Sequence, residues 1–426
     1  MHRLHSLAVL AVVAGCAHSS SSASAADASS ADAADTGPSP DGQAACAATE
    51  VCDGVVDDNC NGVVDEGCGR CPLLSVPCAS GCCSVDRWEV SSKAASATSL
   101  DVDDAGDIYF AYSVPGSNGW TTELAVYDAQ PGTWRTKALG VGTYRARVKL
   151  DSQGRVHVVY GANGGALYYG RSDDHCASYS ATQIGVLSTG GLFDLALDST
   201  GAPHIAYAGE QDYTSFSNLR YAHVGASGWT SEIVDADSHS SDYPDIEIGF
   251  ADRPHIVYDA YEPPGVTATT KRYAYNNGNR CAFENLDTQS VGHTFSGDQY
   301  FSSHVLRIAP DDSRELMYTR HDGSSETLVL AKRGALDADT WQQTTITGAS
   351  DFATPVMFVD EAGMHGAISD GLRIHREAAG AMWTSAALGM AGTHVATARR
   401  GRYLYVGFVA ETGHPTLTVL DLKMTP

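Results

Sequence analysis

From residue 88 onward the chain repeats one short pattern, in which an apolar strand, a tight Asp-x-x-Gly turn and a second apolar strand follow one another. The pattern is clearest at residues 100–112, 148–160 and 195–207. These copies centre on Gly106, Gly154 and Gly201, and weaker copies centre on Asp252, Asp312, Gly363 and Gly401, so that successive turns are separated by 48, 47, 51, 60, 51 and 38 residues. A unit of this length suits four short strands, and it buries its apolar faces only by stacking on its neighbours. The repeat therefore predicts an all-β, seven-bladed β-propeller, with a six-bladed ring containing one degenerate unit as the alternative.

The residues around the turns support strands rather than helices. Apolar residues alternate on both sides of each turn, and no stretch has a sustained period of 3.6 residues. A third strand is expected in three units at residues 167–169, 219–221 and 272–275. In four units a tryptophan begins the expected fourth strand: Trp134, Trp229, Trp341 and Trp383.

The last unit lacks such a fourth strand, because the chain ends shortly after the apolar segment 416–420. The segment Trp88-Glu89-Val90 precedes the first unit and has the same Trp-led character. We therefore expect it to pair with the last unit and close the ring, since closure removes two exposed sheet edges. This places the propeller at residues 85–426.

Three histidines, His157, His204 and His255, stand three residues before a tyrosine in their second strands. They suggest a ring of metal ligands. Repetition at one blade position is more typical of packing, however, and we expect each imidazole to bond a turn. We also expect packing roles for the second-strand tyrosines Tyr112, Tyr160, Tyr207, Tyr258 and Tyr318.

Two isolated cysteines, Cys176 and Cys281, occupy positions where other units carry tryptophan. They fall in the second and fourth units, which are not neighbours in the ring. A disulfide between them is not expected, because bridged Cα atoms lie within about 7 Å of each other. Partners in the N-terminal region and free thiols both remain open.

The N-terminus has the layout of an export signal. A single arginine near the start precedes the apolar stretch Leu7 to Val13, which is too short to span a bilayer. Cys16 follows Val13-Ala14-Gly15, and this arrangement resembles the signal of bacterial lipoproteins, in which the cysteine is acylated and becomes the new N-terminus. The resemblance implies a signal peptide at 1–15 and a lipid-anchored (palmitate-type) protein of the cell envelope. The alternative is an ordinary secretory signal cleaved near Ala17. If Cys16 is lipidated, the alanine that follows it favours the outer membrane.

Residues 16–45 are almost entirely Ala, Ser, Asp, Gly and Pro, so they cannot bury enough apolar surface to fold and are expected to form a flexible linker. The whole chain carries 27 basic and 51 acidic residues, a formal charge of −24. This charge argues against nucleic acid or anionic lipid as a partner and is compatible with divalent cations.

Eight cysteines crowd into residues 46–84: Cys46, Cys52, Cys60, Cys68, Cys71, Cys78, Cys82 and Cys83. An even number in a segment too short for a core, in an exported protein, favours a disulfide framework over a zinc site. Its connectivity stays open, because eight cysteines allow 105 pairings.

A candidate calcium loop lies inside this Cys-rich module. Counting Asp57 as position 1, the oxygen ligands fall at positions 1, 3, 5, 7 and 9. Position 12, where a calcium loop carries a bidentate glutamate, is Cys68, so Glu66 or Asp53 would have to complete the shell. The stretch resembles a metal-binding Cys-Asp-Gly…Val-Asp-Glu-Gly motif of large bacterial surface proteins. The expected ligands are Asp57, Asn59, Asn61, Val63, Asp65, Glu66 and Asp53, and the alternative is a pair of disulfide-held turns without metal.

Ligand sites of propellers generally lie at one mouth of the central channel, formed by the starts of inner strands and the ends of second strands. Here these segments are polar. The best candidate patch joins a basic and acidic cluster in the fifth unit to acids of the sixth: His304, Arg320, His321, Asp322, Asp351 and Asp370.

The repeat also resembles, loosely, bacterial propellers of the broad sialidase-like group. Sialidases carry a Ser-x-Asp-x-Gly-x-x-Trp box, whereas the turns here read Asp-x-x-Gly and lead into a strand; no Arg-Ile-Pro-type segment supplies an arginine triad. The resemblance implies a fold and not an activity. We expect a non-catalytic envelope lipoprotein whose propeller binds a glycan or a protein. The alternative is a polysaccharide-active hydrolase or lyase on the same scaffold.

Overall fold

The computed structural model describes residues 75–78, 81–84, 87–117, 119–129, 132–188, 192–210, 217–235, 240–261, 268–276, 281–290, 304–322, 325–335, 340–346, 356–359, 365–369, 372–378 and 382–422. The predicted lipid site at Cys16 lies outside these residues. So do all the predicted calcium ligands: Asp53, Asp57, Asn59, Asn61, Val63, Asp65 and Glu66.

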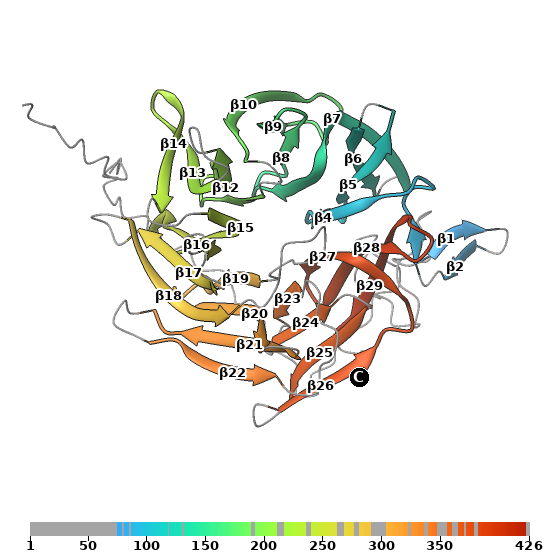
Figure 1. Ribbon diagram of the computed structural model, residues 1–426. Helices are drawn as coiled ribbons and strands as arrows, with labels where there is room; N and C mark the ends of the chain where they lie inside the picture. Colours follow the sequence, from blue (N-terminus) through green and yellow to red (C-terminus); the bar gives the residue numbers. More distant parts are fainter. Residues whose placement is uncertain are drawn as a thin grey trace, which may run out of the picture.

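Seven antiparallel blades follow one another around a ring, as the sequence predicts (Figure 1). Blade 1 consists of β4 (Ser96–Val102), β5 (Ile108–Gly116), β6 (Gly119–Asp128) and the first half of β7 (Thr133–Leu150). Blade 2 consists of the second half of β7, β8 (Val156–Ala162), β9 (Ala166–Ser172) and β10 (Ser180–Val186). Blade 3 consists of β11 (Phe193–Leu197), β12 (Pro203–Glu210), β13 (Ser217–Gly225) and β14 (Gly228–Asp235).

The remaining blades have the same strand order. Blade 4 consists of β15 (Ser240–Ile248), β16 (Pro254–Tyr261), β17 (Ala268–Asn276) and β18 (Cys281–Ser290). Blade 5 consists of β19 (His304–Ile308), β20 (Arg314–Asp322), β21 (Ser325–Arg333) and β22 (Gln342–Ile346). Blade 6 consists of β23 (Val356–Val359), β24 (His365–Ser369), β25 (Arg373–Ala378) and β26 (Met382–Ala387). Blade 7 consists of β27 (Gly392–Arg400), β28 (Tyr403–Ala410), β29 (Pro415–Asp421) and the N-terminal β3 (Trp88–Glu89).

Other elements are few among the described residues. A hairpin of β1 (Ser75–Cys78) and β2 (Gly81–Ser84) precedes the ring, and a 3-10 turn η1 (Phe250–Asp252) joins two strands of blade 4. Within the ranges given above, no helix has the length and apolarity that a bilayer span requires.

The Asp-x-x-Gly turns join the first and second strands of their blades. In blades 1 to 3 the aspartate carbonyl accepts a hydrogen bond from the glycine amide, for example Gly154 N to Asp151 O at 2.9 Å. The glycines have φ values of 72° to 87°, which residues with a Cβ rarely adopt. The Asp151 carboxylate also accepts a hydrogen bond from the amide of Arg155, at 2.9 Å. The motif recurs because the turn needs this acceptor and this conformation together.

The ring closes through the segment that the sequence singled out. β3 pairs with β29, with Trp88 opposite Leu417 and Glu89 opposite Thr416. Trp88 is only 8% exposed, and its cluster includes Phe110 of blade 1 and Tyr405 of blade 7. The predicted closure and the seven-bladed count are therefore confirmed, and the six-bladed alternative is excluded.

The aligned histidines have the predicted structural role. Nδ1 of His157 lies 2.7 Å from the Tyr169 hydroxyl, and Nε2 lies 3.2 Å from a carboxylate oxygen of Asp151 in the turn. His204 repeats this arrangement with Tyr221 and Asp198. His255 lies 2.5 Å from the Tyr273 hydroxyl, and its Nε2 is 3.7 Å from Asp312 of the next turn. The second-strand tyrosines are also packed as predicted, since all five are at most 7% exposed: Tyr112, Tyr160, Tyr207, Tyr258 and Tyr318.

Cys176 is a buried free thiol in blade 2, so the expectation of no bond to Cys281 is confirmed. Burial raises the pKa of the Cys176 thiol to about 11. Cys281 begins β18 in blade 4. The two residues lie in separate blades that are not neighbours, which is the geometric reason for the expectation.

A different histidine, His365, makes the junction of blades 5 and 6 sensitive to pH. Its Nδ1 lies 2.5 Å from Glu377 and its Nε2 lies 2.6 Å from Glu315 of the preceding blade. Bonding to Glu315 and Glu377 outweighs burial and raises the His365 pKa above its ordinary value. A raised folded-state pKa means that this contribution to stability is complete below about pH 6.5 and is lost as pH rises through the folded-state pKa.

We therefore expect the stability difference between the wild type and the His365→Gln variant to be largest near pH 5.5 and to shrink at alkaline pH. Urea unfolding of both proteins at a series of pH values measures this difference. The His375→Gln variant supplies a control of opposite sign: burial lowers the His375 pKa to about 4, so the contribution of His375 to stability should fall as pH drops below about 6.5. A difference that does not change with pH would show that folding leaves the His365 pKa unchanged.

Candidate functional site

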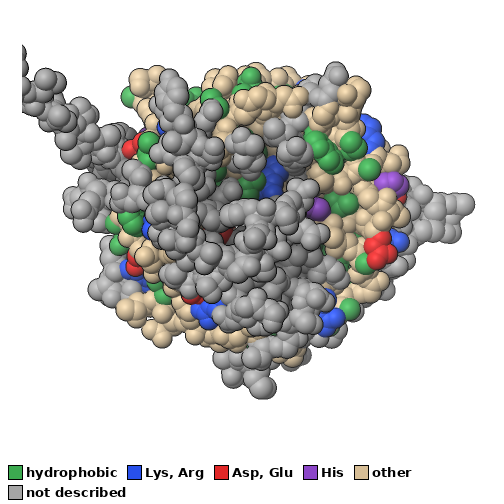
Figure 2. All heavy atoms as spheres, in the orientation of Figure 1, with side chains coloured by type: hydrophobic (Ala, Val, Ile, Leu, Met, Phe, Trp, Pro, Cys, Tyr) green, Lys and Arg blue, Asp and Glu red, His purple; other side chains and the backbone are tan. Residues whose placement is uncertain are grey.

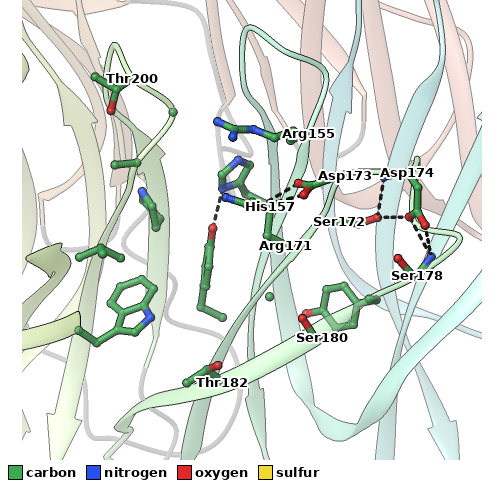
Figure 3. Close-up of a pocket in the computed structure, with 18 residues that line it drawn as sticks. Arg155, His157, Arg171, Ser172, Asp173, Asp174, Ser178, Ser180, Thr182 and Thr200 are labelled. Carbon is green, nitrogen blue, oxygen red and sulfur yellow. Dashed lines mark hydrogen bonds and ion pairs between the residues drawn. The ribbon is translucent and has the colours of Figure 1, made fainter. Parts of the chain in front are cut away.

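A groove between blades 2 and 3 has a volume of about 760 Å³ (Figure 3). One wall is β9 and the connection that leads from it to β10. The other wall comprises the Asp-x-x-Gly turn of blade 3 at 200–203 and Trp229 of β14. The groove therefore lies on the side of the ring that carries the Asp-x-x-Gly turns, away from the predicted channel mouth.

An aromatic pair supplies the apolar part of this groove. The rings of Tyr169 and Trp229 meet edge to face, with centroids 5.0 Å apart and an interplanar angle of 60°. His157 fixes the tyrosine through its hydroxyl, as described above. Val224 lies opposite Trp229 in the β13–β14 ladder and is 45% exposed, so apolar surface faces water here.

Charged and hydroxyl side chains surround the aromatic pair. Arg171 and Asp173 form an exposed ion pair at 2.9 Å, and Arg155 is held 2.5 Å from the Asp151 carboxylate. Hydroxyl groups come from both walls: Ser172, Ser178, Ser180, Thr182 and Thr200 (Figure 3). The groove thus combines one apolar face with many short hydrogen-bonding groups.

The connection from β9 to β10 is held in place by its own hydrogen bonds. The Ser172 hydroxyl donates to Asp174 at 2.7 Å, and the Ser178 amide donates to the same carboxylate at 2.8 Å. The Cys176 amide donates to the Ser172 hydroxyl at 2.9 Å. This wall of the groove is therefore formed before any ligand arrives.

Where the protein shifts the pKa of an ionisable side chain in the groove, the shift is away from pH 7. Hydrogen bonds from Ser178 and Ser172 lower the pKa of Asp174 to about 2. Burial lowers the pKa of His157 and raises that of Tyr169 to about 12. An acid or base that transfers protons near pH 7 needs a pKa near that value. These three side chains therefore suit binding better than proton transfer.

The interface of blades 4 and 5 repeats the aromatic pair, but here the tyrosine is fully buried. Tyr273 and Trp341 have centroids 5.3 Å apart and an interplanar angle of 79°. The Trp341 indole donates to Glu284 at 3.2 Å, and Arg333 forms an ion pair with the same carboxylate. The Arg333 guanidinium also lies 6.0 Å from the centre of the Trp341 ring. Glu284 and Arg333 thus cover part of the Trp341 ring.

The predicted ligand patch is only partly described. His304 of β19 lies 2.9 Å from the Lys271 ammonium, inside the interface of blades 4 and 5. Arg320 of β20 donates to Asp287 at 2.7 Å and to Gln343 at 2.6 Å, so it joins fourth strands of two blades. The backbones of His321 and Asp322 lie in β20. The side chains of His321 and Asp322, and all of Asp351 and Asp370, lie outside the described residues, so the patch stays a prediction.

Carboxylates on the inner strands join neighbouring blades. Asp101 accepts a hydrogen bond from the Leu150 amide of blade 2 at 2.8 Å, and Asp245 accepts one from the Leu306 amide of blade 5 at 2.6 Å. Asp194 pairs with Arg147 at 2.8 Å. Figure 2 shows basic side chains (blue) near the centre of the ring. These contacts give the polar inner strands a structural role.

Sequence reasoning missed the groove. Two local signals point to it. The connection between the third and fourth strands of blade 2 spans residues 173–179, whereas the same connection in blade 3 is 226–227. The fourth strand of the next blade keeps its tryptophan, Trp229, while blade 4 has Cys281 at that position.

Similarity to known proteins is found among solved structures alone. No protein-family model matches the chain, and no curated protein matches it. Among solved structures, the polysaccharide lyase Uly1 is 10% identical, with a TM-score of 0.47, covering 77% of this chain and 90% of that one. A fucose-specific lectin from Aleuria aurantia is 11% identical, with a TM-score of 0.45 and coverage of 69% and 95%. The β-propeller domain of the trilobed protease from Pyrococcus furiosus is 8% identical, with a TM-score of 0.45 and coverage of 77% and 95%.

Proposed function

We propose that this protein is a non-catalytic carbohydrate-binding propeller and that its binding site is the groove between blades 2 and 3. The observation that carries the proposal is the partly exposed Tyr169–Trp229 pair inside a groove rimmed by hydroxyls and the Arg171–Asp173 ion pair. A sugar ring has an apolar face that packs on an aromatic ring, and hydroxyl groups that bond arginine and carboxylate side chains.

The size of the groove favours an oligosaccharide over a folded protein partner. Small-molecule sites are concave and enclose roughly 300–1,000 Å³, and the groove, at about 760 Å³, falls in this range. A stable protein interface instead buries about 800 Å² on each partner, over a broad surface. The groove is narrow, because two blades wall it (Figure 3).

Binding without turnover fits the chemistry of the side chains. Asp174 is committed to the loop hydrogen bonds, and its lowered pKa keeps it ionised at neutral pH. Arg155 is committed to Asp151. We therefore favour a binding protein over the hydrolase or lyase alternative.

We further propose that the propeller is held at the cell envelope, at the outer membrane, by acylation of Cys16, with residues 16–45 as the tether and a structural calcium ion in the Cys-rich module. Support for this part comes from the sequence alone. Retention of the Cys16→Ser variant in the membrane fraction would contradict the anchor.

The test of binding uses the full chain on a glycan array, followed by calorimetry with the best-retained oligosaccharide. We expect the Trp229→Ala variant to bind it about 10- to 100-fold more weakly, since roughly 1.5–3 kcal/mol is associated with burial of a large apolar side chain. The matched control is Trp341→Ala, which removes the tryptophan of the equivalent pair between blades 4 and 5 and should leave the affinity unchanged.

Incubation of the same oligosaccharide with the protein, followed by measurement of new reducing ends, separates the two function classes. We expect retention without cleavage. Release of reducing ends would support the enzyme instead, and equal affinity in the two tryptophan variants would move the site away from the groove.

A further inference from the structure

Two aspartates and a histidine converge at the junction of blades 1 and 2, outside the groove. Asp103 and Asp107 lie in the Asp-x-x-Gly turn of blade 1, and His175 lies in the connection from β9 to β10. One ligand atom of each of the three residues lies within 4.8 Å of the other two. His175 Nδ1 is 3.5 Å from Asp107 Oδ2, so this nitrogen faces the carboxylates.

Both carboxylates are oriented by backbone amides. Asp103 Oδ1 accepts a hydrogen bond from the Asp107 amide at 2.8 Å, and Asp107 Oδ1 accepts one from the Ala129 amide at 2.7 Å. These bonds fix the orientation of both carboxylates. The Tyr109 hydroxyl lies 2.6 Å from His175 Nδ1, so a third oxygen atom lies beside the two carboxylates.

The turn of blade 2 shows what is unusual about this cluster. There the aspartate, Asp151, is neutralised by Arg155 four residues later, at 2.5 Å. In blade 1 the residue four positions after Asp103 is Asp107, an acid instead of a base. The same turn therefore carries two acids in blade 1 and an acid paired with a base in blade 2.

The loop that carries His175 is fixed to blade 1 by two cations. Arg135 of β7 donates to the His175 carbonyl and pairs with Asp128 at 2.8 Å. Lys137 of the same strand donates to the carbonyls of Cys176 at 3.2 Å and Ala177 at 2.8 Å. His175 itself has a φ of 50°. The imidazole is therefore held over the carboxylates before any ion binds.

We propose that Asp103, Asp107 and His175 form a binding site for a divalent transition-metal ion, with the Tyr109 hydroxyl beside it. Two carboxylate oxygens and one imidazole nitrogen suit Mn²⁺ or Zn²⁺, whereas calcium takes only oxygen ligands. The ion joins blade 1 to the β9–β10 loop. Asp173, Asp174 and Ser178 of that loop line the groove, so the ion also stiffens one wall of the groove.

The experiment uses the full chain, stripped with a chelator and then dialysed against Mn²⁺. Bound metal is counted in the wild type and in the His175→Gln and Asp107→Asn variants. The matched control is Asp104→Asn, which removes an exposed acid of the same turn that is not part of the cluster. We expect the wild type and Asp104→Asn to bind one more equivalent of Mn²⁺ than either cluster variant.

Electron spin-echo spectroscopy of the bound Mn²⁺ separates this site from the candidate calcium loop of the Cys-rich module, which offers only oxygen ligands. The wild type should show nitrogen modulation from a coordinated imidazole, and His175→Gln should lose it. Wild-type protein without nitrogen modulation would overturn the site, even if a variant failed to fold. Equal Mn²⁺ stoichiometry in all four proteins would also overturn it.

Discussion

Replacing Trp88 by alanine is expected to lower the free energy of unfolding by about 3–5 kcal/mol, the range for deletion of a buried aromatic side chain. The strand that carries it, β3, has only two residues, so its backbone hydrogen bonds to β29 hold the ring closed only weakly. Packing of the Trp88 indole supplies most of the stabilisation of this closure. The indole packs in the cluster shared by blades 1 and 7, and its ring lies 5.8 Å from that of Tyr127.

Urea unfolding at equilibrium measures this effect, and Glu89→Ala is the matched control. Glu89 is the other residue of β3, but its side chain is 52% exposed, and its contact is an ion pair with His414 at 3.0 Å. Exposed pairs of this kind contribute about 0–1 kcal/mol. If Trp88→Ala lost no more stability than Glu89→Ala, β3 would not be what holds the ring closed.

Replacing Lys271 by methionine is expected to destabilise the protein by about 3–5 kcal/mol, because it leaves a buried carboxylate without its cation. The Lys271 ammonium lies 2.5 Å from Asp259, and the two side chains are 2% and 1% exposed. The same ammonium contacts His304 and lies 6.0 Å from the centre of the Tyr318 ring. The side chain therefore ties blade 4 to blade 5.

A second variant distinguishes the loss of charge pairing from the loss of packing. The double change Lys271→Met with Asp259→Asn removes both charges and should recover part of the stability in urea unfolding, since burying a neutral amide costs less than burying an unpaired charge. A single Lys271→Met variant as stable as the wild type would contradict a stabilising role of the Lys271–Asp259 ion pair. A double variant less stable than the single one would assign the effect to packing.

The fold was predictable from the sequence because its signals are local. The three clear Asp-x-x-Gly turns and their four weaker copies mark seven strand pairs, and in blades 1 to 3 the glycine conformation and the aspartate acceptor are both set within five residues. Closure was predictable because Trp88 repeats the tryptophan that begins the fourth strands elsewhere. The histidines of the second strands were interpreted correctly for the same reason, as repetition indicated a shared packing role.

The groove was not predictable, because it depends on residues far apart in the sequence. Tyr169 and Trp229 are 60 positions apart. The same is true of the side chains that cover the equivalent pair, since Glu284 and Arg333 come from different blades. The prediction that His304 and Arg320 lie at the channel mouth rested on their charge and on their positions along the chain. In the structure they bond Lys271 and Asp287 in the interface of blades 4 and 5, which only tertiary packing decides.

The most direct test of the proposed function is a crystal structure of the protein soaked with the oligosaccharide that the array retains best. We predict electron density for a sugar ring against Trp229, between blades 2 and 3, with hydroxyls in reach of Arg171 and Asp173. Density confined to the channel mouth near His304, with the groove left to solvent, would contradict it.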